Sequence, residues 1–282
     1  MKIYFANMLG AVGLEKYLRH KINVLAAFPS FPKSKEIKKP GYCRNLFVDS
    51  GAFGKAGTKI DLNSYTRFIK KYNNVIHLYA NLDVIGNAEA SWKNQVVMEK
   101  IGLEPLPVFH YGSNIKWLDR LVNKYEYIAL GGLVPITTNA NIIRQWLDYV
   151  WKRILKSNNS NIKVHGFGIQ SINLMKRYPW YSVDATSLHI MARYGGIYTP
   201  WGTLKINPDV NSKEMEWQIK KPILLKQIKD FTEKYIDKLA FADAQENTSV
   251  GTLIRSAISI HYITKELKHH KCSFQVNNHS LF

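Results

Sequence analysis

Short runs of β-branched and aromatic residues alternate along the chain with longer stretches of helical periodicity. The predicted strands are Lys2–Asn7, Asn45–Asp49, Val75–Asp83, Pro105–His110, Tyr127–Gly131, Lys163–Gly166, Tyr181–Asp184 and Lys238–Asp243. The predicted helices include Asp61–Tyr72, Ala90–Ile101, Asn114–Lys124 and Asn139–Lys156. In Asn139–Lys156, apolar side chains recur three and four positions apart, so this helix has one apolar face.

This alternation predicts an α/β fold. Eight strands joined by crossover helices favour a (β/α)8 TIM barrel, and an open doubly wound sheet is the alternative. We expect residues 1–282 to form one barrel domain that ends in C-terminal helices. The stretch Tyr198–Pro222 breaks the rhythm with three prolines and two tryptophans, which predicts an irregular insertion.

Composition narrows the class of protein. With 282 residues, 46% of them hydrophobic, the chain can bury a sizeable core. Its two cysteines exclude a disulfide scaffold and favour a reducing compartment. No apolar run reaches the ~18 residues of a transmembrane helix, and the first residues lack the pattern of a secretory signal. The expected location is therefore the cytoplasm (of the host cell, if a phage encodes the protein).

Charge points to a polyanionic partner. Lys and Arg number 39 against 21 Asp and Glu, which gives a formal charge of +18. Nucleic acid is the simplest partner for such a surface, and a generally basic enzyme is the alternative. One basic cluster, a predicted phosphate contact, precedes the strand Asn45–Asp49, and a solvated loop is its other interpretation. The cluster contains Lys33, Lys35, Lys38, Lys39 and Arg44.

Carboxylates stand at the ends of three predicted strands, at Asp49, Asp83 and Asp184. In a barrel these positions converge on the C-terminal face, where barrel enzymes have their active sites. Two carboxylates in different environments can divide the work at a glycosidic bond, one as nucleophile and one as proton carrier. Metal binding is the alternative, although no second acidic residue lies close to Asp49 or Asp184 in the sequence.

Six ordered segments resemble motifs of the tRNA-guanine transglycosylases. They are VDSGAF (Val48–Phe53), NLDV with Asp83, VFHYG (Val108–Gly112), ALGGL (Ala129–Leu133), HGFG (His165–Gly168) and SVDATS (Ser182–Ser187). The resemblance extends from Met1 to Arg193. Within that superfamily, the amino-acid sequences of these segments are most similar to those of the phage-type DNA 7-deazaguanine transglycosylases. These enzymes exchange guanine in DNA for a 7-deazaguanine base.

The resemblance implies a barrel enzyme without a cofactor, whose partners are DNA and a free 7-deazaguanine such as preQ0. It implies that Asp184 is the nucleophile that holds the covalent glycosyl intermediate. Asp49 would be the general acid and base for the leaving and entering bases. The resemblance also implies a base-binding set of Ser50, Phe53, Asp83, His110, Gly131, Gly132, Leu133, His165 and Gly166.

Individual roles in this set follow from the same resemblance. Phe53 would stack on the base, and Asp83 would accept from the ring N–H and amino group of guanine. His110 stands where the family usually has Gln. The backbone of Gly131–Leu133 would contact the carbonyl oxygen of the base, and His165 and Gly166 would close the opposite side. For Phe53, His110 and His165, simple core packing is the alternative.

The chain departs from the tRNA-type enzymes in one respect. Those enzymes hold a structural zinc with three closely spaced Cys and one His, and here only Cys272 is present beyond the barrel. His269, His270 and His279 lie near Cys272, but their spacing matches no standard metal site, so no metal is expected. Three alternatives remain open: base exchange in tRNA, a non-catalytic nucleic-acid-binding barrel, and a glycosidase of small substrates.

Overall fold

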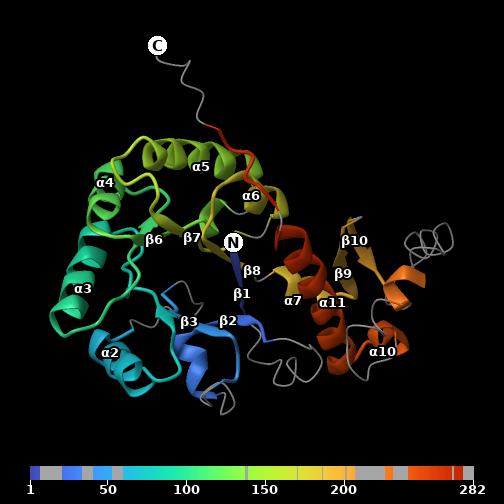
Figure 1. Ribbon diagram of the computed structural model, residues 1–282. Helices are drawn as coiled ribbons and strands as arrows, with labels where there is room; N and C mark the ends of the chain where they lie inside the picture. The colour runs from blue at the N-terminus through green and yellow to red at the C-terminus, as the bar shows by residue number, and fades with distance from the viewer. Residues whose placement is uncertain are drawn as a thin grey trace.

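Eight parallel strands form one curled sheet in the computed structural model (Figure 1). The model describes residues 1–6, 21–33, 41–52, 60–136, 139–169, 171–185, 187–200, 202–206, 226–230, 241–268 and 270–275. The strands are β1 (Lys2–Ala6), β2 (Asn23–Ala27), β3 (Asn45–Asp49), β4 (Leu78–Tyr79), β5 (Val108–His110), β6 (Tyr127–Gly131), β7 (Lys163–Gly166) and β8 (Ser182–Ala185). Their order in the sheet is β4-β3-β2-β1-β8-β7-β6-β5.

The two outer strands, β4 and β5, share no ladder but are linked just beyond their ends. One isolated parallel bridge pairs Ala80 with Leu106. Two backbone hydrogen bonds accompany the bridge: Asn81 N–H donates to Leu106 O at 2.9 Å, and Leu106 N–H donates to Tyr79 O at 2.8 Å.

Helices cover the outside of the curled sheet (Figure 1). They are α2 (Leu62–Lys71), α3 (Ala88–Lys100), α4 (Ile115–Lys124), α5 (Ala140–Leu155), α6 (Ile172–Arg177) and α7 (Ser187–Arg193). Short 3-10 helices, η2 (Phe28–Lys33) and η4 (Val134–Ile136), follow β2 and β6. The four longest of these α-helices begin where an Asp or Asn side chain accepts a hydrogen bond from a first-turn backbone N–H. These capping residues are Asp61, Asn87, Asn114 and Asn139.

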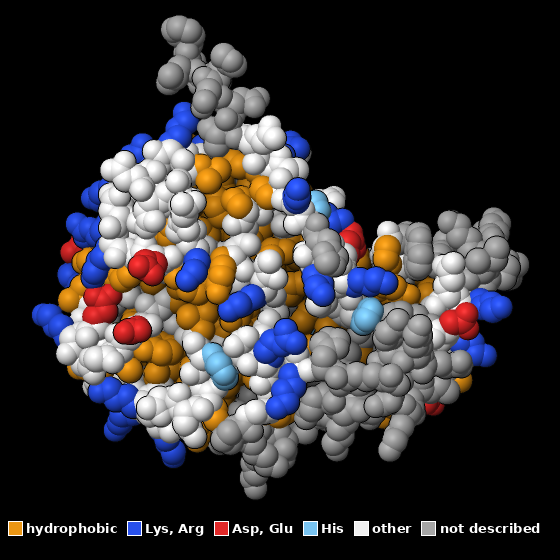
Figure 2. Space-filling view, in the orientation of Figure 1, with side chains coloured by type: hydrophobic (Ala, Val, Ile, Leu, Met, Phe, Trp, Pro, Cys, Tyr) orange, Lys and Arg blue, Asp and Glu red, His pale blue; other side chains and the backbone are white. Residues whose placement is uncertain are grey.

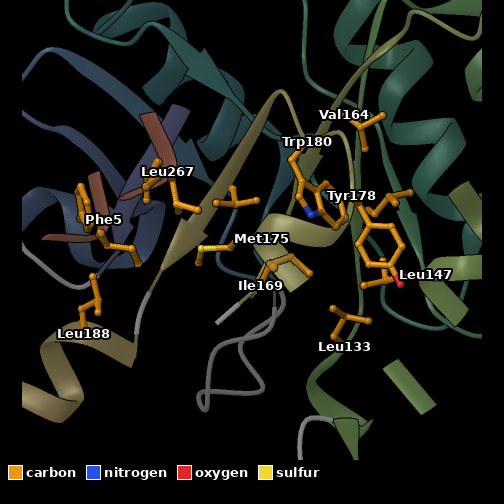
Figure 3. Packing of buried hydrophobic residues seen from close by; sticks show 14 of the residues in the cluster. Phe5, Leu133, Leu147, Val164, Ile169, Met175, Tyr178, Trp180, Leu188 and Leu267 are labelled. Atoms are coloured by element: carbon orange, nitrogen blue, oxygen red, sulfur yellow. The ribbon is translucent and has the colours of Figure 1, made fainter. Parts of the chain in front are cut away.

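The sheet has an apolar core on each face because successive side chains of a strand point to opposite sides. On the concave side, Tyr4, Phe47 and Ala129 belong to one buried cluster. On the convex side, a larger cluster fills the space between strands and helices, and Figure 3 shows part of it, including Val164, Trp180 and Leu147. Alternate residues of a strand therefore pack into different cores, one set on the concave side of the sheet and the other on the convex side.

A second unit follows β8 and α7. Strands β9 (Gly196–Thr199) and β10 (Gly202–Lys205) form an antiparallel hairpin, and the helices α10 (Phe241–Gln245) and α11 (Ser249–Lys268) follow. Helix α11 packs against β9 and α7. Arg255 of α11 is fully buried and donates to the carbonyl oxygens of Ala192 and Ala244, at 2.7 and 2.6 Å. This side chain thus ties the C-terminal helices to the segment after β8.

The α/β class, the parallel sheet and the C-terminal helices of the sequence prediction are confirmed. One predicted strand was wrong, and one strand of the structure was not predicted. Lys238–Asp243 is not a strand where it is described, because Phe241–Gln245 is helical, and strand β2 (Asn23–Ala27) was not predicted. The first part of the predicted irregular insertion Tyr198–Pro222 is the β9–β10 hairpin, and residues 207–222 lie outside the described residues. The single-domain expectation stays a prediction.

None of the helices in the described residues combines the length and the apolarity that a membrane crossing requires.

Candidate active site

Three carboxylates meet at the C-terminal edge of the parallel sheet. Asp49 is the last residue of β3, Asp184 lies near the end of β8, and Asp83 follows β4. Because the strands are parallel, these ends share one edge. The negative charges of Asp184 and Asp83 both raise the pKa of Asp49, so the three groups are close enough to interact. The structure therefore places the three predicted residues at the same edge of the sheet, and their joint role in one site stays a prediction.

Asp49 is the carboxyl group that can exchange a proton near neutral pH. Burial, followed by the charges of Asp184 and Asp83, raises its pKa from 3.8 to about 6. The backbone N–H groups of Gly51 and Ser50 donate to the carboxylate and limit the rise. A carboxyl group with this pKa is suited to act as both general acid and general base.

Asp184 is held in place through one of its two oxygens. The Gly168 N–H donates to Asp184 Oδ1 at 2.7 Å, and His165 Nε2 lies 3.6 Å from the same oxygen. The Asp184 residue is only 5% exposed. Within the described part of the chain, Oδ2 accepts no hydrogen bond, so this oxygen retains its lone pairs for another partner.

A chain of hydrogen bonds leads to His165 from the opposite side. The Tyr127 hydroxyl lies 2.6 Å from Ser182 Oγ, and Ser182 Oγ lies 2.6 Å from His165 Nδ1. The register of β7 and β8 pairs His165 with Ser182 directly. Burial raises the pKa of the Tyr127 hydroxyl, which therefore keeps its proton.

These contacts favour one direction of donation along the chain. Tyr127 donates to Ser182, and Ser182 donates to His165 Nδ1, so the proton of the neutral imidazole is on Nε2, facing Asp184. The opposite direction would place a lone pair of Nε2 against the carboxylate. Burial lowers the pKa of His165, which favours the neutral ring. The Nε2–H of His165 then faces Asp184 Oδ1 at a distance of 3.6 Å, too far for a hydrogen bond in this structure.

Asp83 is held between two side chains. His110 Nε2 lies 3.2 Å from Asp83 Oδ2, and the Asn81 side-chain amide donates to Asp83 Oδ1 at 3.2 Å. Burial raises the pKa of Asp83, while the contacts with His110 and Asn81 lower it. Each carboxylate oxygen has a second lone pair, so Asp83 can still accept from two adjacent N–H groups of a ligand.

Two glycines leave room beside His110. At Gly131, a Cβ atom would lie 3.2 Å from Val108 Cγ1 and 3.5 Å from His110 Cδ2. Gly132 has φ +76°, and a Cβ atom there would lie 2.9 Å from His110 Cβ and 3.0 Å from Tyr111 N. The glycine pair at the end of β6 therefore accommodates the close approach of the end of β5.

The remaining predicted base-binding residues differ in how well their positions fit the predicted role. Ser50 is buried next to Asp49. Leu133 packs its side chain into the outer core, so only its backbone is available for the predicted contact. Gly166 packs toward Trp180 and Ile169, on the opposite face of β7 from His165, so its predicted contact with the base is not supported. Phe53 lies outside the described residues.

The predicted phosphate-binding cluster is not near the carboxylates where it is described. Arg44 immediately precedes β3, whereas Asp49 is the last residue of that strand. Five residues of strand place them roughly 16 Å apart, at opposite ends of the sheet. The structure does not describe Lys35, Lys38 and Lys39, and it describes only the backbone of Lys33.

Sequence reasoning gave no role to several residues that shape the site. Asn81, Tyr127, Gly168 and Ser182 all contact the predicted residues. Alternation along a strand was a usable signal for Ser182, which lies two positions before Asp184 and so on the same face. No such signal exists for Tyr127, because its contact depends on the packing of three strands.

Among the residues that the structure describes, no group of three or more His, Cys, Asp and Glu side chains is arranged so that it could hold a metal ion. In the C-terminal tail, His270 Nε2 lies 2.9 Å from Lys176 O, and the Cys272 thiol contacts Arg177 O at 2.9 Å. His269 and His279 are outside the described residues.

Comparison of the sequence with protein-family models found no match, and a search of curated proteins also found none. The chemistry of the site therefore has to be argued from its own geometry.

Proposed function

We propose that this protein is a DNA-guanine transglycosylase that exchanges guanine in DNA for a 7-deazaguanine base such as preQ0. The observation that carries the proposal is the pair of unlike carboxylates. Asp49 has a pKa of about 6, and its neighbour Asp184 is anchored through Oδ1 by Gly168. Two carboxyl groups whose environments differ in this way are suited to separate roles at a glycosidic bond.

In the first half-reaction, Asp184 Oδ2 attacks C1′ of the deoxyribose as the C1′–N9 bond breaks. The bonding electrons pass to the leaving guanine, which takes the proton of the Asp49 carboxylic acid. The sugar is then esterified to Asp184, and Asp49 is a carboxylate. The Gly168 N–H, which donates to Oδ1, holds the carboxylate so that Oδ2 is the reacting oxygen, and His165 Nε2 lies 3.6 Å from the same Oδ1.

In the second half-reaction, the incoming 7-deazaguanine gives the proton of its five-membered-ring nitrogen to the Asp49 carboxylate. That nitrogen attacks C1′, the ester bond breaks, and the Asp184 carboxylate is restored. Water must be kept from the ester, because hydrolysis would leave an abasic site. The low exposure of Asp184 is consistent with this requirement.

Recognition of the base falls to Asp83 and its neighbours. Guanine and 7-deazaguanines present a ring N–H beside an exocyclic amino group, which a carboxylate can bind with both oxygens. Asn81 and His110 orient Asp83 for this contact. A base without these donors would leave the remaining lone pairs of the buried carboxylate without a partner, which disfavours its binding.

The fold proposed for this function is a closed (β/α)8 barrel. The Ala80–Leu106 bridge, which links the outer strands β4 and β5, supports closure of the sheet. A closed barrel would place Asp49, Asp83, His110 and Asp184 around one opening at the C-terminal face.

DNA is proposed as the polymer because of the +18 charge and the resemblance to the DNA-modifying branch. The test supplies labelled preQ0 with duplex DNA and, in a parallel reaction, with tRNA, using wild-type and Asp184→Ala proteins. Label in DNA that disappears with the variant is the expected result. Label in tRNA alone would assign the chain to tRNA exchange, and label in neither would overturn base exchange. A variant that still exchanges bases would overturn the assignment of the nucleophile.

A further inference from the structure

A cavity of about 370 Å³ opens at the N-terminal ends of β1, β2 and β3. It lies at the opposite end of these strands from Asp49. Its wall also includes the last turns of α11, and the lining residues are Met1, Lys2, Ile3, Phe5, Lys21, Ile22, Asn23, Arg44, Asn45, Thr264, Leu267 and Lys268. Figure 2 shows Lys and Arg side chains gathered around the middle of this face, where Figure 1 places the N-terminus.

The charge of this cavity is entirely positive among its described lining residues. Lys2, Lys21, Arg44 and Lys268 are exposed, and no Asp or Glu is among the residues that line the cavity. None of the four forms a salt bridge with a described acidic residue. Like charges around a concave surface reinforce each other's potential, so the cavity attracts anions.

The floor of the cavity is apolar. Ile3 and Phe5 of β1 contribute to it, together with Ile22 and Leu267. Phe5 and Leu267 also belong to the outer core, which fixes their positions (Figure 3). The flat apolar ring of a ligand can therefore pack on this floor, while a charged group of the same ligand lies among the lysines at the rim.

Two amides supply directional contacts. The Asn45 side-chain amide donates to Asn23 Oδ1 at 2.7 Å, and the Asn23 amide donates to Ile3 O at 3.1 Å. These bonds fix the orientation of both side chains. Within the described residues, Asn45 Oδ1 accepts no hydrogen bond, so it is available to accept from an N–H of a bound ring.

We propose that this cavity is a second site that binds a nucleoside 5′-phosphate. The phosphate would lie among Lys21, Arg44 and Lys268, the base on the apolar floor, and a base N–H against Asn45 Oδ1. The volume falls in the usual range for small-ligand sites, which begins at roughly 300 Å³. A free mononucleotide and the 5′-phosphorylated end of a DNA strand present the same chemistry. The inference does not rest on the proposed catalytic function.

The experiment measures binding of dTMP to the full chain by calorimetry and by the shift in Tm. Thymine lacks the amino group that the candidate active site is proposed to read, which separates the two sites. Thymidine and inorganic phosphate are the comparison ligands. The wild-type protein should bind dTMP at least tenfold more tightly than either of them. Equal binding of inorganic phosphate would overturn the nucleoside part of the proposal, and absence of dTMP binding would overturn it entirely.

Matched variants locate the site. Lys21→Gln combined with Arg44→Gln should weaken dTMP binding at least tenfold, and Asn45→Leu, which removes the oxygen that accepts from the base, should also weaken it. Lys70→Gln combined with Lys152→Gln removes the same charge from exposed positions of α2 and α5 and should leave binding unchanged. Equal weakening by both double variants would indicate a nonspecific charge effect and overturn the site.

The source of the nucleotide is decided by a third comparison. Oligothymidylates with and without a 5′-phosphate are titrated under the same conditions as dTMP. Tighter binding of the phosphorylated oligomer than of dTMP supports a DNA end as the ligand. Tighter binding of dTMP supports a free nucleotide. Equal binding of both oligomers, with dTMP no tighter than either, would overturn recognition of a 5′-phosphate.

Discussion

His110 Nε2 lies 3.2 Å from Asp83 Oδ2, and the two side chains are each only 8% exposed. His110 ends β5, and Asp83 follows β4. These are the two outer strands of the sheet, so the pair joins the same elements that the Ala80–Leu106 bridge joins. The contact thus couples the position of Asp83, the carboxylate proposed to bind the base, to the pairing of the outer strands.

Asp83→Asn should weaken binding of the free base. The amide replaces one acceptor oxygen with a donor, which opposes the N–H groups of guanine and preQ0. Hydrogen bonds to charged groups are worth about 1.5–3 kcal/mol, so the loss should be roughly 10- to 150-fold. Equilibrium dialysis with labelled preQ0 measures it. His110→Gln, which retains a donor toward Asp83, is the control, and unchanged binding by Asp83→Asn would refute the role of this carboxylate.

Asp49 should make stability depend on pH in a specific direction. Its pKa is about 6 in the native state against 3.8 as the ordinary value, so the native state binds more protons between these pH values. The contribution of Asp49 to stability is therefore greatest at low pH and declines as pH rises from about 4 to above 6. At pH 8 the ionised group destabilises the fold by up to about 3 kcal/mol.

Asp49→Asn removes this ionisation. Relative to wild type, the variant should be more stable at pH 8 than at pH 4, so its free energy of unfolding minus that of wild type should be larger at pH 8 by up to about 3 kcal/mol. Urea unfolding at both pH values gives this difference directly. Comparing the two pH values cancels the effect of the amide on hydrogen bonds from Ser50 and Gly51. A difference of zero would mean that the pKa of Asp49 is not raised.

His165 should be neutral, with its proton on Nε2. The hydrogen bonds from Tyr127 through Ser182 to Nδ1 set this tautomer, and burial lowers the pKa of the ring. Nitrogen NMR of ¹⁵N-labelled protein distinguishes the tautomers, and a His165→Gln protein assigns the signal. A proton on Nδ1 in wild type would contradict the proposed anchoring of Asp184.

Ser182→Ala should disturb this arrangement without touching Asp184. The change leaves Nδ1 of His165 and the Tyr127 hydroxyl without their shared partner, at a cost of about 1–3 kcal/mol in stability. The NMR signal should shift toward a mixture of tautomers. Ser182→Thr, which keeps the hydroxyl, is the matched variant and should restore the Nε2–H form.

Gly132→Ala should be more destabilising than Gly112→Ala. Both glycines have positive φ, +76° and +81°, so both variants carry the same backbone strain, of order 1 kcal/mol. A Cβ atom at Gly132 also meets His110 and Tyr111 at 3.0 Å or less, whereas nothing lies within 4 Å at Gly112. Unfolding in urea measures both. Equal losses would mean that the close packing between β5 and β6 adds nothing.

The sequence predicted the helices well because their signals are local. Asp61, Asn114 and Asn139 were expected to start helices, and each is the capping residue of one. Strand β2 was missed because Asn23–Ala27 contains two alanines and has little β-propensity of its own. It is a strand because β1 and β3 pair with it on both sides, a long-range effect.

In the candidate site, too, local sequence signals were sufficient for some residues, whereas others depend on long-range contacts. Asp49, Asp83 and Asp184 were identified because each follows a recognisable strand, and parallel strands bring their ends together. The anchoring of Asp184 by Gly168, and the link from Tyr127 to His165, depend on side chains meeting across strands. Gly166 was assigned to the base site although it is adjacent to His165, and adjacent strand residues face opposite sides.

The most direct test of the central claim is to trap the sugar on Asp184. Wild-type protein is mixed with a guanine-containing DNA oligonucleotide without added preQ0, quenched in acid, digested and analysed by mass spectrometry. Trypsin releases Asp184 in the peptide Tyr178–Arg193. We expect this peptide to carry the DNA adduct in wild type, and the adduct to be absent from the Asp184→Ala protein. An adduct on another residue, or base exchange without any adduct on this peptide, would contradict the account.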